Sequence, residues 1–65
     1  MRTADAEPLL TVADLAAYTG LPVATIYALN HKGTGPRRIR VGKFVRYRRS
    51  DVDRWLDANS VEPVA

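Results

Sequence analysis

The strongest constraint on the fold is a helix stop signal followed almost immediately by a helix start signal. Thr11, with Asp14 three residues later, has the spacing of a capping box, in which two side chains satisfy free backbone N–H groups at a helix start. Gly20 is the residue type that most often ends a helix. Pro22 then suits the first turn of a new helix, where its missing N–H is not needed. The segment 12–19 is therefore predicted to be a helix that ends in a tight turn.

The second helix is predicted to run from Pro22 to the residues before Gly33, with Ile26 and Leu29 facing inward. Ala16 is small and lies where the two helices would cross. Two short helices joined by a glycine-containing turn of three or four residues form a helix-turn-helix. An ordinary helical hairpin is the alternative interpretation.

A β-hairpin is predicted next, because residues 32–36 read as a loop and residues 38–49 alternate apolar with basic side chains. A two-residue turn at Gly42 mixes both kinds of side chain on each face, whereas a three-residue turn over residues 42–44 separates them. The apolar face then pairs Val41 with Val45 and Ile39 with Tyr47, and the basic face pairs Arg40 with Arg46 and Arg38 with Arg48. We therefore predict the three-residue turn.

The last predicted helix follows Ser50, its expected N-cap, and carries an apolar stripe at i, i+3 and i+4 formed by Val52, Trp55 and Leu56. Trp55, the largest apolar side chain, is the expected core anchor. The predicted fold is α+β, mainly α: a small winged helix-turn-helix of two helices, a two-stranded hairpin wing and a closing helix.

Composition limits what this fold can carry. The chain has 65 residues, no cysteine and one histidine, so disulfides and His/Cys metal sites are not expected, nor is a cofactor. No phosphate-binding glycine loop is present and His31 has no recognisable nucleophile partner, so no enzyme activity is expected. No signal peptide or membrane-spanning run is recognisable, which predicts a cytoplasmic protein. The domain is expected over residues 9–59, with flexible tails at 1–8 and 60–65.

The basic residues are strongly clustered. Eight of the ten Lys and Arg residues fall within residues 32–49, and all seven Asp and Glu residues lie outside that window. Such a distribution predicts a polyanionic partner, and nucleic acid is favoured over a membrane because the basic stretch is not an amphipathic helix. A protein module whose Arg-rich hairpin grips an acidic partner is the alternative.

Residues 9–58 resemble the excisionase-type DNA-binding proteins, small relatives of the MerR winged-helix group. The resemblance is carried by TVADLAAYTGLPVATIY for the helix-turn-helix, VGKFVRY for the wing and SDVDRWL for the closing helix. The short single-domain layout is most similar to phage excisionases, also called recombination directionality factors. The same module also occurs in small transcription regulators, which are the alternative function.

The resemblance implies a protein without catalytic activity of its own. No membrane association and no small-molecule substrate are expected. The resemblance also implies binding to double-stranded DNA at repeated sites near a phage attachment site, beside neighbouring copies of the same protein, within the bacterial host nucleoid. Bending of that DNA would direct a tyrosine integrase toward prophage excision and away from integration.

The expected DNA contacts come from the second helix and the wing. They are Pro22, Val23, Ala24, Thr25, Tyr27, Ala28, His31 and Lys32, together with Arg37, Arg38, Arg40, Lys43, Phe44, Arg46 and Arg48. The outward face of the helix lacks a long charged donor, so we expect little direct base readout, with the wing, DNA shape and neighbouring copies supplying selectivity. Phe44 is expected at the wing tip, where it folds back onto the core, contacts the minor groove or meets a neighbouring protomer.

Overall fold

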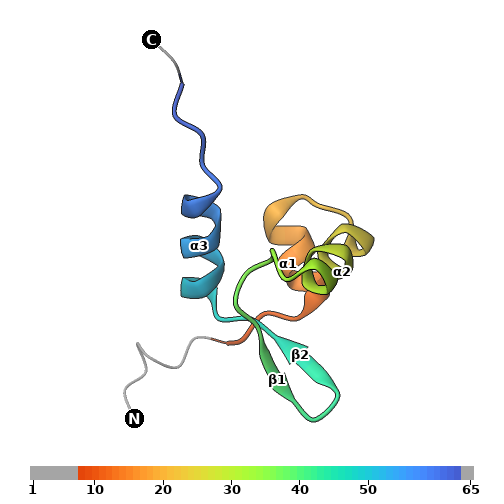
Figure 1. The fold of residues 1–65 in the computed structure, drawn as a ribbon. Helices are drawn as coiled ribbons and strands as arrows, with labels where there is room; N and C mark the ends of the chain where they lie inside the picture. The colour runs from red at the N-terminus through yellow and green to blue at the C-terminus, as the bar shows by residue number, and fades with distance from the viewer. Residues whose placement is uncertain (1–7, 64–65) are drawn as a thin grey trace, which may run out of the picture.

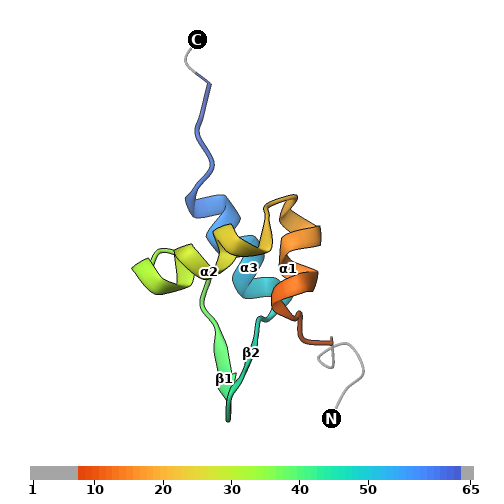
Figure 2. The same ribbon diagram turned by 90° about the vertical axis from the view of Figure 1, so that its right-hand side faces the viewer.

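The computed structural model describes residues 8–63. Its elements are helix α1 (Val12–Thr19), helix α2 (Val23–Lys32), strands β1 (Ile39–Val41) and β2 (Phe44–Arg46), and helix α3 (Arg49–Ala58). The three helices form one body, and the antiparallel hairpin of β1 and β2 projects from it as a wing (Figure 1; Figure 2). This architecture confirms the predicted winged helix-turn-helix fold.

The predicted tails lie partly beyond this description. Residues 1–7 and 64–65 are outside the described residues. Residues 60–63 are exposed and belong to no helix or strand, and Val61 is 90% exposed.

Local signals set the start and end of α1 as predicted. The backbone N–H of Thr11 donates to the Asp14 carboxylate and the backbone N–H of Asp14 donates to the Thr11 hydroxyl, both over 3.0 Å. Gly20 ends the helix with φ = 75°, a left-handed conformation that glycine adopts without steric cost. Pro22 departs from the prediction by one position: it is the extended N-cap residue of α2, and the helix itself begins at Val23.

The two helices meet at the angle expected of a helix-turn-helix. They bend by 107° at the turn between them, within the usual range of about 90–120° for this motif. Within residues 8–63 no single helix is long and apolar enough to cross a membrane; α1 and α2 reach that length and hydropathy only as this bent pair.

Tyr47, and not Trp55, is the anchor of the core. The buried cluster consists of Leu15, Ala16, Ile26, Tyr47 and Val52, and Tyr47 is its largest fully buried side chain. Trp55 is only half-buried, and its indole N–H donates to the Thr34 carbonyl over 2.8 Å. The indole therefore holds the loop before the wing against α3 from outside the cluster, because its N–H finds its acceptor in that loop.

Tyr47, the residue directly after β2, also anchors the base of the wing. Its backbone pairs with Leu10 through two N–H···O bonds of 2.8 and 2.9 Å. Its hydroxyl accepts a hydrogen bond from the Asn30 side chain over 2.7 Å. The base of the wing is thus held by the segment before α1 and by α2.

The register of the hairpin differs from the prediction. The cross-strand partners are Ile39 with Arg46, Arg40 with Val45, and Val41 with Phe44. The turn therefore contains two residues, Gly42 and Lys43. Gly42 has φ = 60° and Lys43 does not have a positive φ, the pattern of a type II′ turn with glycine in its first central position.

Two physical causes explain why the predicted pairing is wrong. Tyr47 pairs with Leu10, so it is not available to oppose Ile39. The wing also projects away from the core, leaving Val41 58% and Phe44 54% exposed, so separating apolar from basic side chains gains little burial energy. The predicted oppositions of Arg40 to Arg46 and of Arg38 to Arg48 are consequently absent from the hairpin.

Helix α3 begins earlier than predicted. Arg48 is its N-cap, without a side-chain cap, and the Val52 N–H donates to the Arg48 carbonyl over 3.0 Å. Ser50, the predicted N-cap, lies inside the first turn. Because Tyr47 is fixed by its bridge to Leu10, the chain turns into the helix immediately after it.

Candidate nucleic-acid interface

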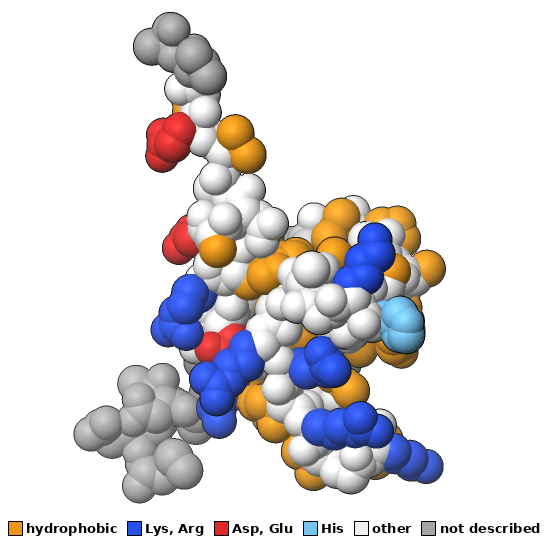
Figure 3. Space-filling view, in the orientation of Figure 1, with side chains coloured by type: hydrophobic (Ala, Val, Ile, Leu, Met, Phe, Trp, Pro, Cys, Tyr) orange, Lys and Arg blue, Asp and Glu red, His pale blue; other side chains and the backbone are white. Residues whose placement is uncertain are grey.

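The predicted contact residues lie on the surface of α2, the loop after it and the wing, except that Pro22 is the N-cap of α2 and Arg48 the N-cap of α3. All of them are exposed except Thr25 and Arg46, which are half-buried. Basic side chains gather over the loop and the wing, while the acidic side chains visible on the same face lie on α3 and the segment after it (Figure 3). The clustering seen along the sequence is therefore also a clustering in space.

The outward side of α2 is apolar near its start and basic at its end. Val23 is 41% exposed and Tyr27 58% exposed, and Ala24 and Ala28 are exposed beside them. His31 and Lys32 occupy the last turn, where the positive charge of Lys32 interacts favourably with the helix dipole. The helix contains no acidic residue, so nothing on it repels a polyanion.

A hollow of about 330 Å³ separates the wing from the helix-turn-helix. It is lined by residues from the start of α1, from α2 and from the wing, namely Thr11, Val12, Ala13, Tyr27, Lys43, Phe44, Val45 and Arg46. The structure thereby brings four predicted contact residues, Tyr27, Lys43, Phe44 and Arg46, around one concave surface.

Phe44 is the aromatic side chain of the wing within this surface. The Lys43 ammonium lies 5.7 Å and the Arg46 guanidinium 5.5 Å from the centre of its ring, within cation–π range. With 54% of its surface exposed, Phe44 does not fold back onto the core. Its position at the start of β2, and not inside the turn, is a further correction to the prediction.

The start of α1 adds a negative charge near the hollow. The pKa of Asp14 is lowered chiefly by the hydrogen bond from the Thr11 backbone, then by the hydrogen bond with the Thr11 side chain, with a smaller contribution from the positive charge of Arg46. Arg46 also donates to the Val45 carbonyl over 2.8 Å. The Arg46 guanidinium is therefore already engaged in an intramolecular hydrogen bond and is half-buried, whereas Arg40 and Lys43 are exposed.

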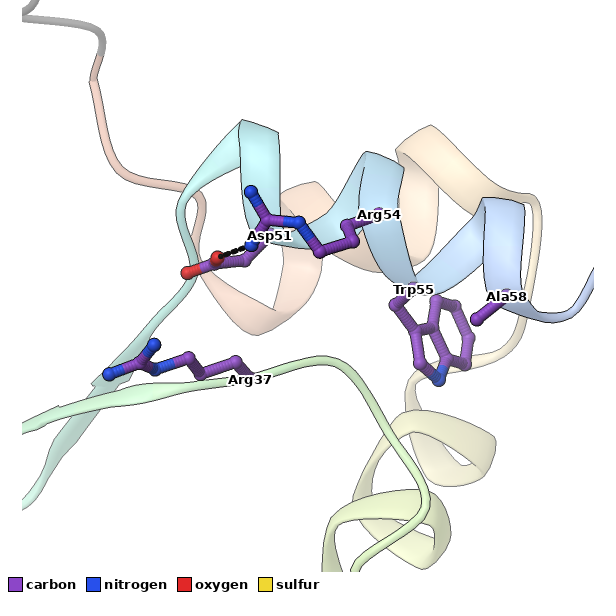
Figure 4. A pocket seen from close by; sticks show the side chains of 5 residues that line it. All are labelled: Arg37, Asp51, Arg54, Trp55 and Ala58. Atoms are coloured by element: carbon purple, nitrogen blue, oxygen red, sulfur yellow. Dashed lines mark hydrogen bonds and ion pairs between the residues drawn. The ribbon is translucent and has the colours of Figure 1, made fainter.

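Arg37 occupies a different position from the other predicted contacts. It lines a second hollow of about 270 Å³, between the loop before the wing and α3 (Figure 4). Across this hollow lie the ion pair of Arg54 with Asp51 (3.2 Å), the Trp55 ring and Ala58. The structure thus groups Arg37 with α3 and does not bring it to the hollow beside the wing.

The sequence prediction missed the residues at the start of α1. Thr11, Val12 and Ala13 line the hollow beside the wing, although only their role in starting the helix was expected. For the wing side of the hollow, the sequence signal is Gly42-Lys43 read as a type II′ turn, because that turn places Phe44 in β2, where it shares a face with Arg46. Among the residues described, no three His, Asp or Glu side chains gather into a group able to hold a metal ion.

A helix-turn-helix with an exposed basic hairpin beside its second helix defines a DNA-binding protein of the winged type. A family model described as a helix-turn-helix domain matches residues 9–60, and the chain belongs to this family. Members of this family bind DNA, and its domains are generally not enzymes. A search of curated proteins finds no match to the chain.

Proposed function

We propose that this protein is an excisionase, which binds repeated sites near a phage attachment site, bends the DNA and directs a tyrosine integrase toward excision. Family membership supports DNA binding, and the resemblance of residues 9–58 to excisionase-type proteins supports the particular role. The observation that carries the proposal is the exposed basic wing standing beside an apolar second helix. A protein of this kind gains affinity mainly from the DNA backbone and makes few hydrogen bonds to base edges, so that DNA shape contributes to its selectivity, which suits an architectural role.

The residues divide into two groups of contacts in this proposal. The outward face of α2 enters the major groove with Pro22, Val23, Ala24, Thr25, Tyr27, Ala28, His31 and Lys32. The wing and the loop before it contact phosphates and the adjacent minor groove with Arg37, Arg38, Arg40, Lys43, Phe44, Arg46 and Arg48. Residues 9–59 form the binding domain, and neighbouring copies bind side by side in the host nucleoid.

The test begins with a search for a tyrosine integrase gene and an attachment site beside the gene of this protein, and continues with a reconstituted excision reaction that uses them. Addition of this protein is expected to raise the yield of excised circle and to lower the yield of integration. A gel-shift series with the binding site at permuted positions is expected to show a bend. Tight binding at a promoter, without any effect on recombination, would instead support the transcription regulator.

A further inference from the structure

The outward face of α2 has an unusual composition for a helix placed against DNA bases. Val23 and Tyr27 are 41% and 58% exposed, and Ala24 and Ala28 are exposed next to them. Three of these four side chains have no hydrogen-bonding group at all. They cannot form the bidentate contacts by which Arg, Asn or Gln distinguish bases.

The major groove offers one apolar feature, the 5-methyl group of thymine, and every other base feature there is a hydrogen-bond donor or acceptor. We propose that α2 reads its target through thymine methyl groups, which pack against Val23, Ala24 and Ala28. This inference rests on the proposed placement of α2 in the major groove. It does not depend on the excisionase role.

The spacing of these residues sets the size of the contacted element. Ala28 follows Val23 by five positions, a rise of about 7.5 Å along the helix axis. Base pairs are stacked about 3.4 Å apart, so this face spans roughly two base-pair steps. The target is therefore expected to carry at least two thymines, on either strand, within about three adjacent base pairs.

Charge favours DNA over a second protein as the occupant of this face. Lys32 follows on the same helix, and the wing beside it carries Arg40 and Lys43. No acidic residue lies on α2. An apolar strip bordered by cations matches a groove that offers methyl groups between two rows of phosphates.

The experiment first selects preferred sites from a pool of random DNA duplexes and then replaces each selected thymine in turn by deoxyuridine, which removes only the methyl group. At the contacted positions the Kd at constant salt is expected to rise about fourfold per methyl, the value of one buried CH₂ or CH₃ group. Thymines outside this element are expected to tolerate the replacement. A second set of duplexes carries C·G or 5-methyl-C·G at a contacted position, and the methylated form is expected to bind about fourfold more tightly.

A double-mutant cycle that combines Val23→Ala in the protein with each deoxyuridine replacement in the DNA tests whether a thymine methyl group contacts α2. In this variant one deoxyuridine replacement is expected to leave the Kd nearly unchanged, while the other replacements still raise it about fourfold. Val61→Ala, a change of the same size at a 90% exposed position after α3, serves as the matched control and should leave every effect intact.

The outcomes separate the two levels of the proposal. DNA binding in which every deoxyuridine replacement changes the Kd by less than 1.5-fold, as a rough limit, overturns thymine-methyl readout but leaves the DNA interface standing. Failure to bind any duplex, even at low salt, overturns the interface itself and this inference with it. Because the decisive substitutions are made in the DNA, the result does not depend on a variant protein folding.

Discussion

Tyr47 connects the parts of this molecule more directly than any other residue of the core. Its ring is fully buried, its backbone pairs with Leu10, and its hydroxyl accepts a hydrogen bond from Asn30. The side-chain amide oxygen of Asn30 (Oδ1) is buried and has no hydrogen-bond partner among the described residues. The side-chain NH₂ group of Asn30 donates its hydrogen bond to the Tyr47 hydroxyl, so this side chain depends on Tyr47 for its hydrogen bonding.

Tyr47→Phe is expected to lower the free energy of unfolding by about 1–3 kcal/mol, because it leaves the Asn30 N–H₂ group without its partner. Urea unfolding followed by circular dichroism measures the change. Tyr27→Phe is the matched control: Tyr27 is 58% exposed, and its change is expected to stay within about 0.5 kcal/mol. Equal effects of the two substitutions would contradict the role assigned to Tyr47.

Asp14 makes the stability of α1 depend on acid pH. Its pKa lies below the ordinary value of 3.8, mainly because of the hydrogen bond from the Thr11 backbone. A lowered folded pKa means that the carboxylate stabilises the fold above the unfolded pKa and that this stabilisation is lost as pH falls through the folded pKa. Urea midpoints measured from about pH 6 downward are expected to approach each other for the native chain and Asp14→Asn once the pH falls below the unfolded pKa, and to converge below the lower, folded pKa of Asp14. A constant difference across the whole range would show that the capping box is not formed.

At the scale of elements, the wing owes its register to its turn and to its base. Gly42 provides the positive φ that a two-residue turn needs at its first position, and Tyr47 is fixed beyond the end of β2. Between these two points, β1 and β2 each have three residues. Short strands that project from the core gain little from side-chain burial, so the turn contributes strongly to the register of the wing.

Replacement of Gly42 by L-alanine is expected to weaken the wing by about 1–2 kcal/mol, the cost of left-handed backbone for an L-residue. No atom lies within 4 Å of the position of the added Cβ, so the penalty comes from the backbone alone. D-alanine, placed by chemical synthesis, is the matched control because it favours the positive φ. NMR contacts between Val41 and Phe44 should persist with D-alanine and weaken with L-alanine; the opposite order would argue for a different register.

The relative contributions of wing and helix to DNA binding can be compared directly. The sequence points to Arg40 and Arg46 as the pair to replace, but Arg46 is half-buried and bonded to the Val45 carbonyl. Arg40 with Lys43 is the cleaner pair, since both are exposed. Replacing both by alanine is expected to weaken binding at least tenfold in a gel-shift titration because two phosphate contacts are lost, whereas Thr25→Ala is expected to cost less. The reverse order would show that the helix contributes more than the wing.

At the scale of the whole molecule, charge is unevenly distributed. On the face that Figure 3 shows, most basic side chains gather over the loop and the wing, whereas the acidic ones lie on α3 and the segment after it, where Arg54 is paired with Asp51. Arg49 lies at the boundary: its guanidinium is 4.4 Å from the centre of the Tyr18 ring and 3.8 Å from the Asp53 carboxylate. This basic residue therefore contributes to the contact between α1 and α3.

This separation predicts a strong dependence of DNA affinity on salt. If about five phosphates are neutralised by the exposed Lys and Arg side chains, the slope of log K against log[salt] is expected to be near −4.5. Fluorescence anisotropy with a labelled duplex at several salt concentrations measures the slope. Replacing Arg40 and Lys43 by alanine should make it shallower by about two units. A slope near zero would exclude the basic wing as the binding surface.

The sequence by itself determined the features that depend on neighbours within about four residues. The capping box of Thr11 with Asp14 and the stop at Gly20 located α1 because each signal acts through the backbone next to it. The clustering of basic residues and the order of elements were likewise readable, and together they indicated a winged helix-turn-helix.

Tertiary structure decided what depends on contacts distant in the sequence. The Leu10–Tyr47 bridge helped to determine the register of the wing and the start of α3, and it made Tyr47 the core anchor in place of Trp55. The hollow that joins Phe44 to Tyr27 and the start of α1 likewise brings together residues that are distant in the sequence. The alternation of apolar and basic side chains could not predict the register of the wing. An exposed two-stranded wing is positioned by its turn and its base, and burial of its own faces contributes little.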